Sequence, residues 1–229
     1  MCALAGPAPA GICGLGTYSY AGVESRVATG GVSAAIASVA PPAVRGGHVA
    51  GWVGVGGQAE GPDGVDAWLQ VGLNALPDDT TNRVYYEVTL PGRQPVYREL
   101  RGGVPTGERH RFAVAEVPNR LGWWRAWVDG SPVSPAFFMP GSHGRWTAQV
   151  LGESWAGNAS SGRCNGYGYS FGQVMLAGGK KRLWRPASKL DLFQDANYRL
   201  FRLSRSGFLA AAVETLSSRA AAVATPAAP

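Results

Sequence analysis

The stretch AWLQVGL, residues 67–73, decides which fold is predicted for this chain. Successive side chains of a β-strand point to opposite faces, so the odd-numbered residues of the stretch form one apolar face. Trp68, Gln70 and Gly72 share the other face, which combines an aromatic ring, a polar amide and bare backbone. Such a face is more typical of a groove than of a core, and Gln70 is therefore a candidate functional residue.

Short runs of β-branched and aromatic residues recur along the chain, separated by turn signals rich in Gly, Pro and Asp. One of these signals, Asp129-Gly130, is a typical hairpin turn. The pattern predicts an all-β fold, a single antiparallel β-sandwich of the jelly-roll type. The predicted strands are 17–28, 31–39, 48–56, 66–74, 83–90, 95–100, 109–117, 122–129, 133–138, 146–155, 166–177 and 198–204.

The length and composition of the chain agree with one large domain. The 229 residues include 33 Gly and 16 Pro, and only 16% are charged, which favours strands and turns over a helical bundle. We expect a flexible N-terminal arm over residues 1–16 and a β-sandwich domain over residues 17–207. Residues 208–229 are rich in alanine and are predicted to form a tail, either disordered or with a short helix from Phe208 to Leu216.

The positive charge of the chain is concentrated near its C-terminal end. Residues 180–205 contain eight basic and two acidic residues, which accounts for the whole net charge of +6. A basic segment can bind polyanions, but it is also typical of a solvated loop beside an exposed strand edge. No nucleic-acid-binding motif accompanies it, so no specific nucleic-acid partner is expected. No run of about 18 apolar residues exists, so no membrane span is expected.

The cysteines and histidines do not form a recognisable metal site. Cys2, Cys13 and Cys164 allow at most one disulfide, and no CxxC spacing is present. His48 and the other two histidines lack the spacing of metal ligands. We therefore expect no bound metal and no cofactor. The N-terminus lacks the basic region and the continuous apolar region of a signal peptide.

Two further stretches combine polar or aromatic residues with glycine on one strand face. In AQVLGESW, residues 148–155, Gln149 and Glu153 share a face with a leucine and a tryptophan. In GWVGVGG, residues 51–57, Trp52 and Gly54 alternate with valines. Glycines on one face of neighbouring strands leave room for a ligand backbone, and tryptophans beside them would form walls. Alternatively, the glycines allow sheet curvature and the tryptophans pack beneath a loop.

A glutamate and a glutamine are sufficient to hydrolyse an acyl bond if they meet in one cleft. The carboxylate of Glu153 would take a proton from water as general base and then deliver it to the leaving group. The amide of Gln70 would stabilise the developing oxyanion, a contribution of roughly 3–4 kcal/mol for one donor. Alternatively, Glu153 is a structural carboxylate that pairs with an arginine at a sheet edge, such as Arg125 or Arg145.

Four short blocks occur in the order WVGV (52–55), LQVG (69–72), YYE (85–87) and AQVLGE (148–153). They resemble the corresponding blocks of the glutamic peptidases, or eqolisins, over roughly residues 18–177. The resemblance implies a concanavalin A-like sandwich in which a Gln–Glu dyad, on adjacent strands of the concave sheet, cleaves peptide bonds. Carried over by position, the dyad is Gln70 and Glu153, and Trp52 shapes the cleft.

The resemblance also implies a secreted enzyme that acts on polypeptide substrates, and we expect a monomer. The chain departs from the family in its basic net charge and in carrying glutamine where the family has an acidic residue before Val150. These differences leave substrate preference and pH optimum open. The residues expected to contact the substrate are Trp52, Trp68, Gly54, Gly72, Glu87 and Gln149.

A second function stays open, that of a non-catalytic, lectin-like module that binds carbohydrate or peptide. Trp123 and Trp127 would lie on one face of a strand with Arg125 between them. This arrangement is suited to stacking on sugars or to a cation–π cluster. Burial of the rings beside the sheet core is the structural alternative.

Overall fold

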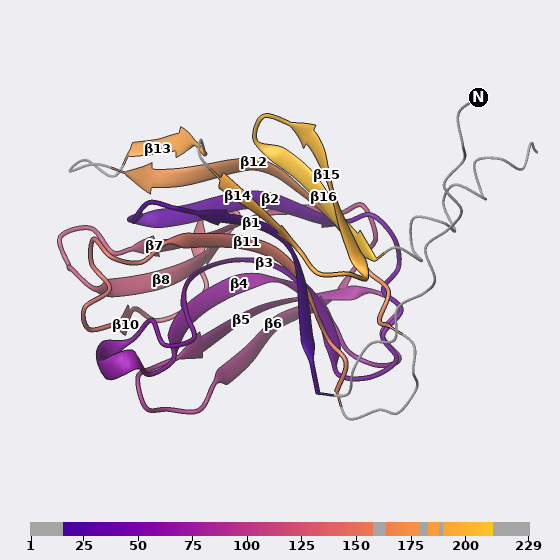
Figure 1. Ribbon diagram of the computed structural model, residues 1–229, viewed down its shortest axis with the longest axis horizontal. Helices are drawn as coiled ribbons and strands as arrows, with labels where there is room; N and C mark the ends of the chain where they lie inside the picture. Colours follow the sequence, from indigo (N-terminus) through magenta and orange to yellow (C-terminus); the bar gives the residue numbers. More distant parts are fainter. Residues whose placement is uncertain (1–15, 158–163, 179–182, 188–189, 213–229) are drawn as a thin grey trace, which may run out of the picture.

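Two antiparallel β-sheets pack face to face and make up the fold (Figure 1). The computed structural model describes residues 16–157, 164–178, 183–187 and 190–212. All strand pairs within these ranges are antiparallel. The prediction of a single all-β antiparallel sandwich is therefore confirmed.

One sheet, which we name the front sheet, has seven strands with β3 at its centre. The central position matters because β3 pairs with β11 on one side and with β4 on the other. In order across the sheet, the strands are β14 (Leu190–Gln194), β1 (Tyr18–Ser25), β11 (Ala148–Trp155), β3 (His48–Gly57), β4 (Ala67–Ala75), β5 (Asn82–Thr89) and β6 (Val96–Val104).

The other sheet, which we name the back sheet, has nine strands. In order along its main path, they are β10 (Phe137–Phe138), β8 (Trp123–Val128), β7 (Arg109–Glu116), β2 (Gly31–Ser38), β12 (Gly168–Gly178), β16 (Gly207–Ala212) and β15 (Tyr198–Ser204). Two short strands lie off this path, β13 (Leu183–Pro186) beside β12 and β9 (Ser131–Pro132) beside β8. A single 3₁₀ turn, η1 (Pro62–Gly64), completes the described elements.

Most of the predicted strands are present with bounds that differ by a few residues. The strand predicted at 133–138 is wrong, because residues 133–136 belong to no strand and only Phe137–Phe138 form the short strand β10. Strands β13 and β14 were not predicted, and both lie in the basic segment 180–205. Their residues are largely exposed, so they lack the alternation of buried and exposed side chains by which strands are predicted.

The predicted helix from Phe208 to Leu216 is wrong over residues 208–212, which belong to strand β16. Strand β16 pairs on both sides, with β12 and with β15, and nearly all of its residues are buried. The Phe208 ring stacks on Phe171 with 4.6 Å between ring centroids. Tertiary packing thus overrides the helical propensity of alanine, and the sandwich continues past residue 207 to at least Ala212. The remainder of the predicted tail, and residues 1–15 of the predicted arm, lie outside the described residues.

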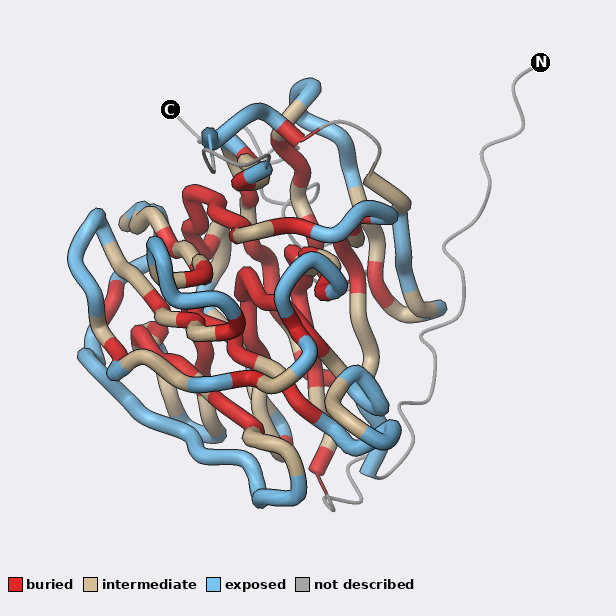
Figure 2. Tube along the Cα trace, turned by 90° about the vertical axis from the view of Figure 1, so that its left-hand side faces the viewer, coloured by how far each residue is buried: buried red, intermediate tan, exposed pale blue. Residues whose placement is uncertain are grey.

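The apolar faces of the strands fill the space between the sheets. Figure 2 shows in red where the chain is buried. On β4, the alternation predicted from residues 67–73 is confirmed, because Leu69, Val71 and Leu73 are fully buried in this core. Their neighbours Trp68 and Gln70 point to the opposite face of the front sheet and line a cleft. The cleft face of the front sheet is therefore its face away from the core.

Two glycines of the front sheet allow Tyr169 of strand β12 and Tyr167, directly before that strand, to pack against the backbone. A Cβ atom at Gly51 would lie 2.6 Å from the ring of Tyr169, and one at Gly152 would lie 2.7 Å from the ring of Tyr167. The two tyrosine rings stack with centroids 5.5 Å apart. Tyr169 also donates a hydrogen bond of 2.8 Å to Asn82 on β5. These contacts fix the distance between the sheets behind the centre of the cleft.

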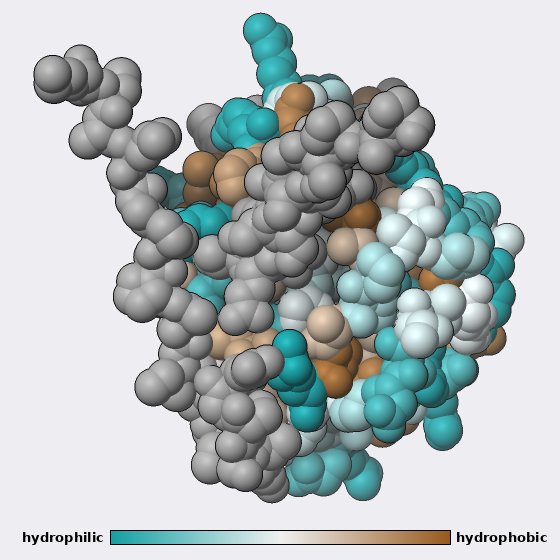
Figure 3. Space-filling view, turned by 90° about the vertical axis from the view of Figure 1, so that its right-hand side faces the viewer, coloured by the Kyte–Doolittle hydropathy of each residue, from teal (hydrophilic) through white to brown (hydrophobic). Residues whose placement is uncertain are grey.

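Hydrophobic residues on the described surface occur in separate patches among hydrophilic ones, as Figure 3 shows for one face of the molecule. The large exposed side chains, among them Leu121, Leu192 and Leu203, come from different elements of the structure. Within the described residues, no helix is long and apolar enough to cross a membrane.

We expect the substitution Gly51→Ala to lower the free energy of unfolding by about 1–3 kcal/mol, because the added methyl group overpacks the contact with Tyr169. Urea denaturation of both proteins measures this difference. The matched control is Gly178→Ala on β12, where no atom of the described residues lies within 4 Å of the new Cβ. Equal stability of Gly51→Ala and the control would show that the sheets do not pack as closely as described.

Candidate active site

A cleft of about 540 Å³ lies on the outer face of the front sheet. Strands β1, β11, β3, β4 and β5 contribute to it, so its residues come from both halves of the chain. Its lining includes most of the residues singled out from the sequence, namely Trp52, Gly54, Trp68, Gln70, Glu87, Gln149 and Glu153.

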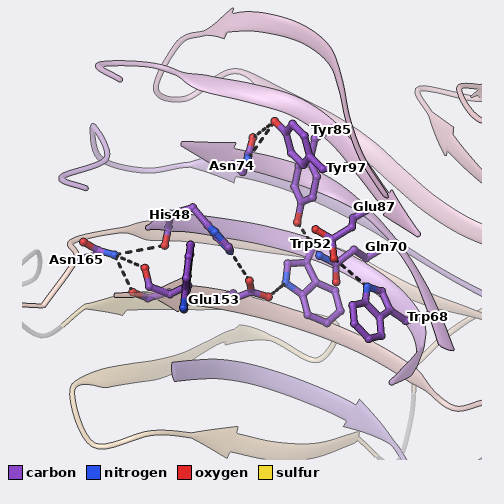
Figure 4. Close-up of polar contacts among 12 residues, drawn as sticks. His48, Trp52, Trp68, Gln70, Asn74, Tyr85, Glu87, Tyr97, Glu153 and Asn165 are labelled. Atoms are coloured by element: carbon purple, nitrogen blue, oxygen red, sulfur yellow. Dashed lines mark hydrogen bonds and ion pairs between the residues drawn. The ribbon is translucent and has the colours of Figure 1, made fainter. Parts of the chain in front are cut away.

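Glu153 is buried at the floor of the cleft, and both of its carboxylate oxygens are hydrogen-bonded. The Trp52 indole Nε1 donates to Oε2 at 2.8 Å, and His48 Nε2 lies 2.7 Å from Oε1. Figure 4 shows the carboxylate between these two rings. Because the partners are Trp52 and His48, the alternative pairing of Glu153 with an arginine is wrong.

The Trp52 indole lies between the side chains of Glu153 and Gln70 (Figure 4). Its Nε1 end bonds Glu153, while its Cζ3 edge lies 2.9 Å from the point where a Cβ atom of Gly54 would be. The Cβ of Gln70 is 3.1 Å from that same point. Gly54 therefore leaves room for the indole and for the stem of Gln70, and Figure 4 shows the indole between Gln70 and Glu153.

Gln70 projects from the middle of β4 and is 8% exposed. Its Nε2 donates to the hydroxyl of Tyr85 on β5 at 3.2 Å. The Tyr85 ring stacks on Tyr97 with 5.5 Å between centroids, and the Tyr97 hydroxyl is bonded to Asn74. A primary amide carries two N–H donors, and the described residues accept from only one of those of Gln70. The second donor can therefore bind a ligand, while the tyrosines hold the orientation of the amide.

Glu87 lies directly opposite Gln70 in the pairing of β4 with β5. Its Oε1 accepts a hydrogen bond of 3.0 Å from Trp68 Nε1. Burial raises the pKa of Glu87 above its ordinary value, and the negative charge of Glu153 acts in the same direction, while the bond from Trp68 opposes both. Near the other end of the cleft, Gln149 Nε2 donates to Glu24 at 3.2 Å.

Two expectations about the site are wrong. Gly72 is not among the residues that line the cleft, because a Cβ at this position would lie 2.1 Å from the carbonyl oxygen of Gly51 on β3. Gly72 therefore permits close approach of two strands and does not face the substrate space. The dyad strands are also not adjacent, since β3 lies between β4, which carries Gln70, and β11, which carries Glu153.

The structure adds residues that sequence reasoning missed, above all His48. His48 and Trp52 are four positions apart on β3, and residues an even number of positions apart on a strand share a face. This spacing is the feature of the sequence from which His48 could have been predicted to lie in the cleft. Asn165 was also missed. Its buried side chain accepts from the backbone N–H of Arg45 and donates to carbonyls of Gly46 and Trp155, which ties the chain before β3 to the end of β11.

The cleft resembles no metal centre. Among the described residues, no group of three or more His, Cys, Asp or Glu side chains is arranged to hold a metal ion. The groups that the cleft offers for chemistry are a buried carboxylate held at two points and an amide with a free donor.

Comparison with known proteins supplies a structural likeness. No protein-family model and no curated protein sequence matches the chain. A scytalido-glutamic peptidase with a peptide-based transition-state analogue matches with a TM-score of 0.61 and 17% identity, over 85% of this chain and 98% of that one. SCP-B, a member of the eqolisin family in complex with the tripeptide Ala-Ile-His, matches with a TM-score of 0.54 and 16% identity. The match covers 85% of this chain and 98% of SCP-B.

In fold, this chain resembles the eqolisins. The predicted resemblance is therefore confirmed for the arrangement of the backbone, and it extends over nearly the full length of the eqolisin structures. Because fewer than one residue in five is identical, the eqolisin-like fold leaves the chemistry of the cleft to be argued from its own residues.

The raised pKa of Glu87 predicts a pH-dependent stability difference. The folded protein binds a proton at Glu87 more tightly than the unfolded chain, so the wild type loses stability as the pH rises above about 4.3. We expect the unfolding free energy of Glu87→Gln, minus that of wild type, to increase as the pH rises from about 4 to about 7.

Denaturation at a series of pH values measures this difference. Glu108→Gln is the control, since hydrogen bonds from Arg101 and His110 lower the pKa of Glu108. For Glu108→Gln, the unfolding free energy minus that of wild type should decrease as the pH rises. A Glu87→Gln difference that is constant with pH would contradict the burial of this carboxylate.

Proposed function

We propose that this protein is an endopeptidase that hydrolyses peptide bonds with Glu153, Gln70 and a water molecule. The observation that carries the proposal is the placement of a buried carboxylate and a buried amide in one cleft, on either side of the Trp52 indole. The two residues come from strands β11 and β4 and share the outer face of the front sheet.

The reaction follows from the donors and acceptors of the cleft. The Glu153 carboxylate accepts a proton from water as the water oxygen attacks the carbonyl carbon of the substrate. The free N–H of Gln70 donates to the oxyanion that forms on the carbonyl oxygen. Glu153 then delivers its proton to the amide nitrogen, the carbon–nitrogen bond breaks, and the carboxylate is regenerated.

The shape of the cleft supports a polypeptide as the substrate. The cleft crosses several strands and is open to solvent, with Trp68 and Glu87 near one end and Gln149 near the other. An extended segment lying across these strands would contact the residues predicted to bind substrate. The eqolisin structures of the same fold hold a peptide-based analogue and a tripeptide, which agrees with this assignment.

We further propose that the enzyme acts in an oxidising compartment such as the extracellular space. Cys164 is disulfide-bonded, and the other two cysteines lie outside the described residues. Disulfides persist in secreted proteins and are rare in the reducing cytosol.

Two substitutions test the reaction. We expect Glu153→Gln to lower kcat/KM for a fluorogenic peptide library by about 10²–10⁴-fold, because the general base is lost. Gln70→Ala should lower it by about 10²–10³-fold through loss of the oxyanion donor. The control Glu108→Gln removes an exposed carboxylate and should retain wild-type activity. Equal cleavage by wild type and the three variants across pH 2–8 would show that Glu153 and Gln70 do not catalyse the reaction.

A second candidate function is a binding module, and a specific feature favours it. A larger cavity of about 890 Å³ lies on the outer face of the back sheet, lined by Ala113, Trp127, Met175 and Trp184 among others. Trp127 is thus available to a ligand, whereas Trp123 is covered by the guanidinium of Arg120 at 3.9 Å. Saturable glycan or peptide binding that is lost in Trp127→Ala, in a wild-type protein without peptidase activity, would favour this function.

A further inference from the structure

His48 is held rigidly against the candidate catalytic carboxylate. Its ring packs on Trp155 and Tyr18, with centroid distances of 5.6 and 6.1 Å. Its side chain is 23% exposed, whereas that of Glu153 is 7% exposed, so the bond between them is shielded from water. The position is therefore constrained by packing on the side away from Glu153.

The backbone of His48 is fixed as well. His48 pairs with Trp155 across β3 and β11, two residues from the pairing of Glu153 with Ala50. Asn165 Nδ2 donates to the carbonyl oxygens of both His48 and Trp155, at 3.4 and 3.0 Å. These bonds tie the start of β3 to the end of β11, so the backbone positions that carry the ring and the carboxylate are held in register.

The direction of the hydrogen bond follows from the chemistry of the partners. An ionised carboxylate has only acceptors, so His48 Nε2 carries the proton that Glu153 Oε1 accepts. Trp52 Nε1 donates to the other oxygen from the same strand. Two donors at opposite ends of a carboxylate fix the plane of the group, and each oxygen keeps a lone pair for another hydrogen.

We propose that His48 is a positioning residue that orients Glu153 toward the attacking water. This inference rests on the proposed peptidase function and adds a residue to its machinery. His48 keeps its own proton throughout the reaction, and the proton taken from water resides on Glu153 until it reaches the leaving nitrogen. A hydrogen bond from His48 to the carboxylate is charge-assisted and therefore strong enough to restrict rotation of the group.

Two substitutions separate the hydrogen bond from the packing of the ring. His48→Gln keeps an N–H donor at a similar distance from the backbone but loses the ring, whereas His48→Phe keeps an aromatic ring and loses the donor. We expect His48→Phe to lower kcat by about 10–100-fold with KM within about twofold of wild type, since the carboxylate loses its orientation. His48→Gln should retain kcat within about threefold of wild type.

The experiment compares these variants with wild type, Glu153→Gln and His143→Phe, the last a control at an exposed histidine outside the cleft. Wild-type activity in His48→Phe, or equal losses in His48→Phe and His48→Gln, would overturn the positioning role. A wild-type protein without activity, or an active Glu153→Gln, would instead show that the proposed peptidase function is wrong.

A nitrogen-15 spectrum of the histidine rings gives a readout that does not depend on activity. In the wild type the Nε2 of His48 should be protonated and hydrogen-bonded, and Glu153→Leu should shift its resonance while leaving that of His143 unchanged. An unchanged His48 resonance in Glu153→Leu would overturn the inference. Thermal unfolding of each variant confirms that the comparison is made between folded proteins.

Discussion

The hydrogen bond from the Trp52 indole to the Glu153 carboxylate is the interaction on which the cleft depends. A carboxylate on a side chain that is only 7% exposed is costly to bury unless donors satisfy it, and Trp52 and His48 supply one donor each. The same indole lies between Glu153 and Gln70 in the cleft (Figure 4). Gly54 is a glycine because that ring and the stem of Gln70 occupy the volume of a side chain.

Strand β3 connects this arrangement to the core. Its cleft face carries His48 and Trp52, while its core face carries Gly51, on which the Tyr169 ring of the back sheet lies. Because the core contact leaves no room for even a methyl group, β3 is held firmly behind the cleft. The rigidity that a positioned carboxylate and amide require thus comes from packing between the sheets.

The electrostatics of the cleft differ from those of the whole chain. The chain carries a net charge of +6, but the cleft lining includes the carboxylates of Glu24, Glu87 and Glu153. Burial, together with the negative charge of Glu153, raises the pKa of Glu87 above its ordinary value. A basic protein can therefore present an acidic cleft, and overall charge is a poor guide to the ligand of this site.

The sequence by itself determined which side chains share a strand face, because a period of two is a property of the extended backbone. It therefore predicted the antiparallel sandwich, the apolar face of 67–73, and Gln70, Glu153 and Trp52 on the face that becomes the cleft. Only the tertiary structure decided which strands are neighbours. The strand order places β3 between the strands of Gln70 and Glu153, and it brings His48 next to Glu153. Pairing with neighbouring strands also places Gly72 against the backbone of β3 and buries the alanine-rich residues 208–212 in strand β16. Alternation along one strand carries no information about its partners, since pairing depends on packing between segments far apart in the chain.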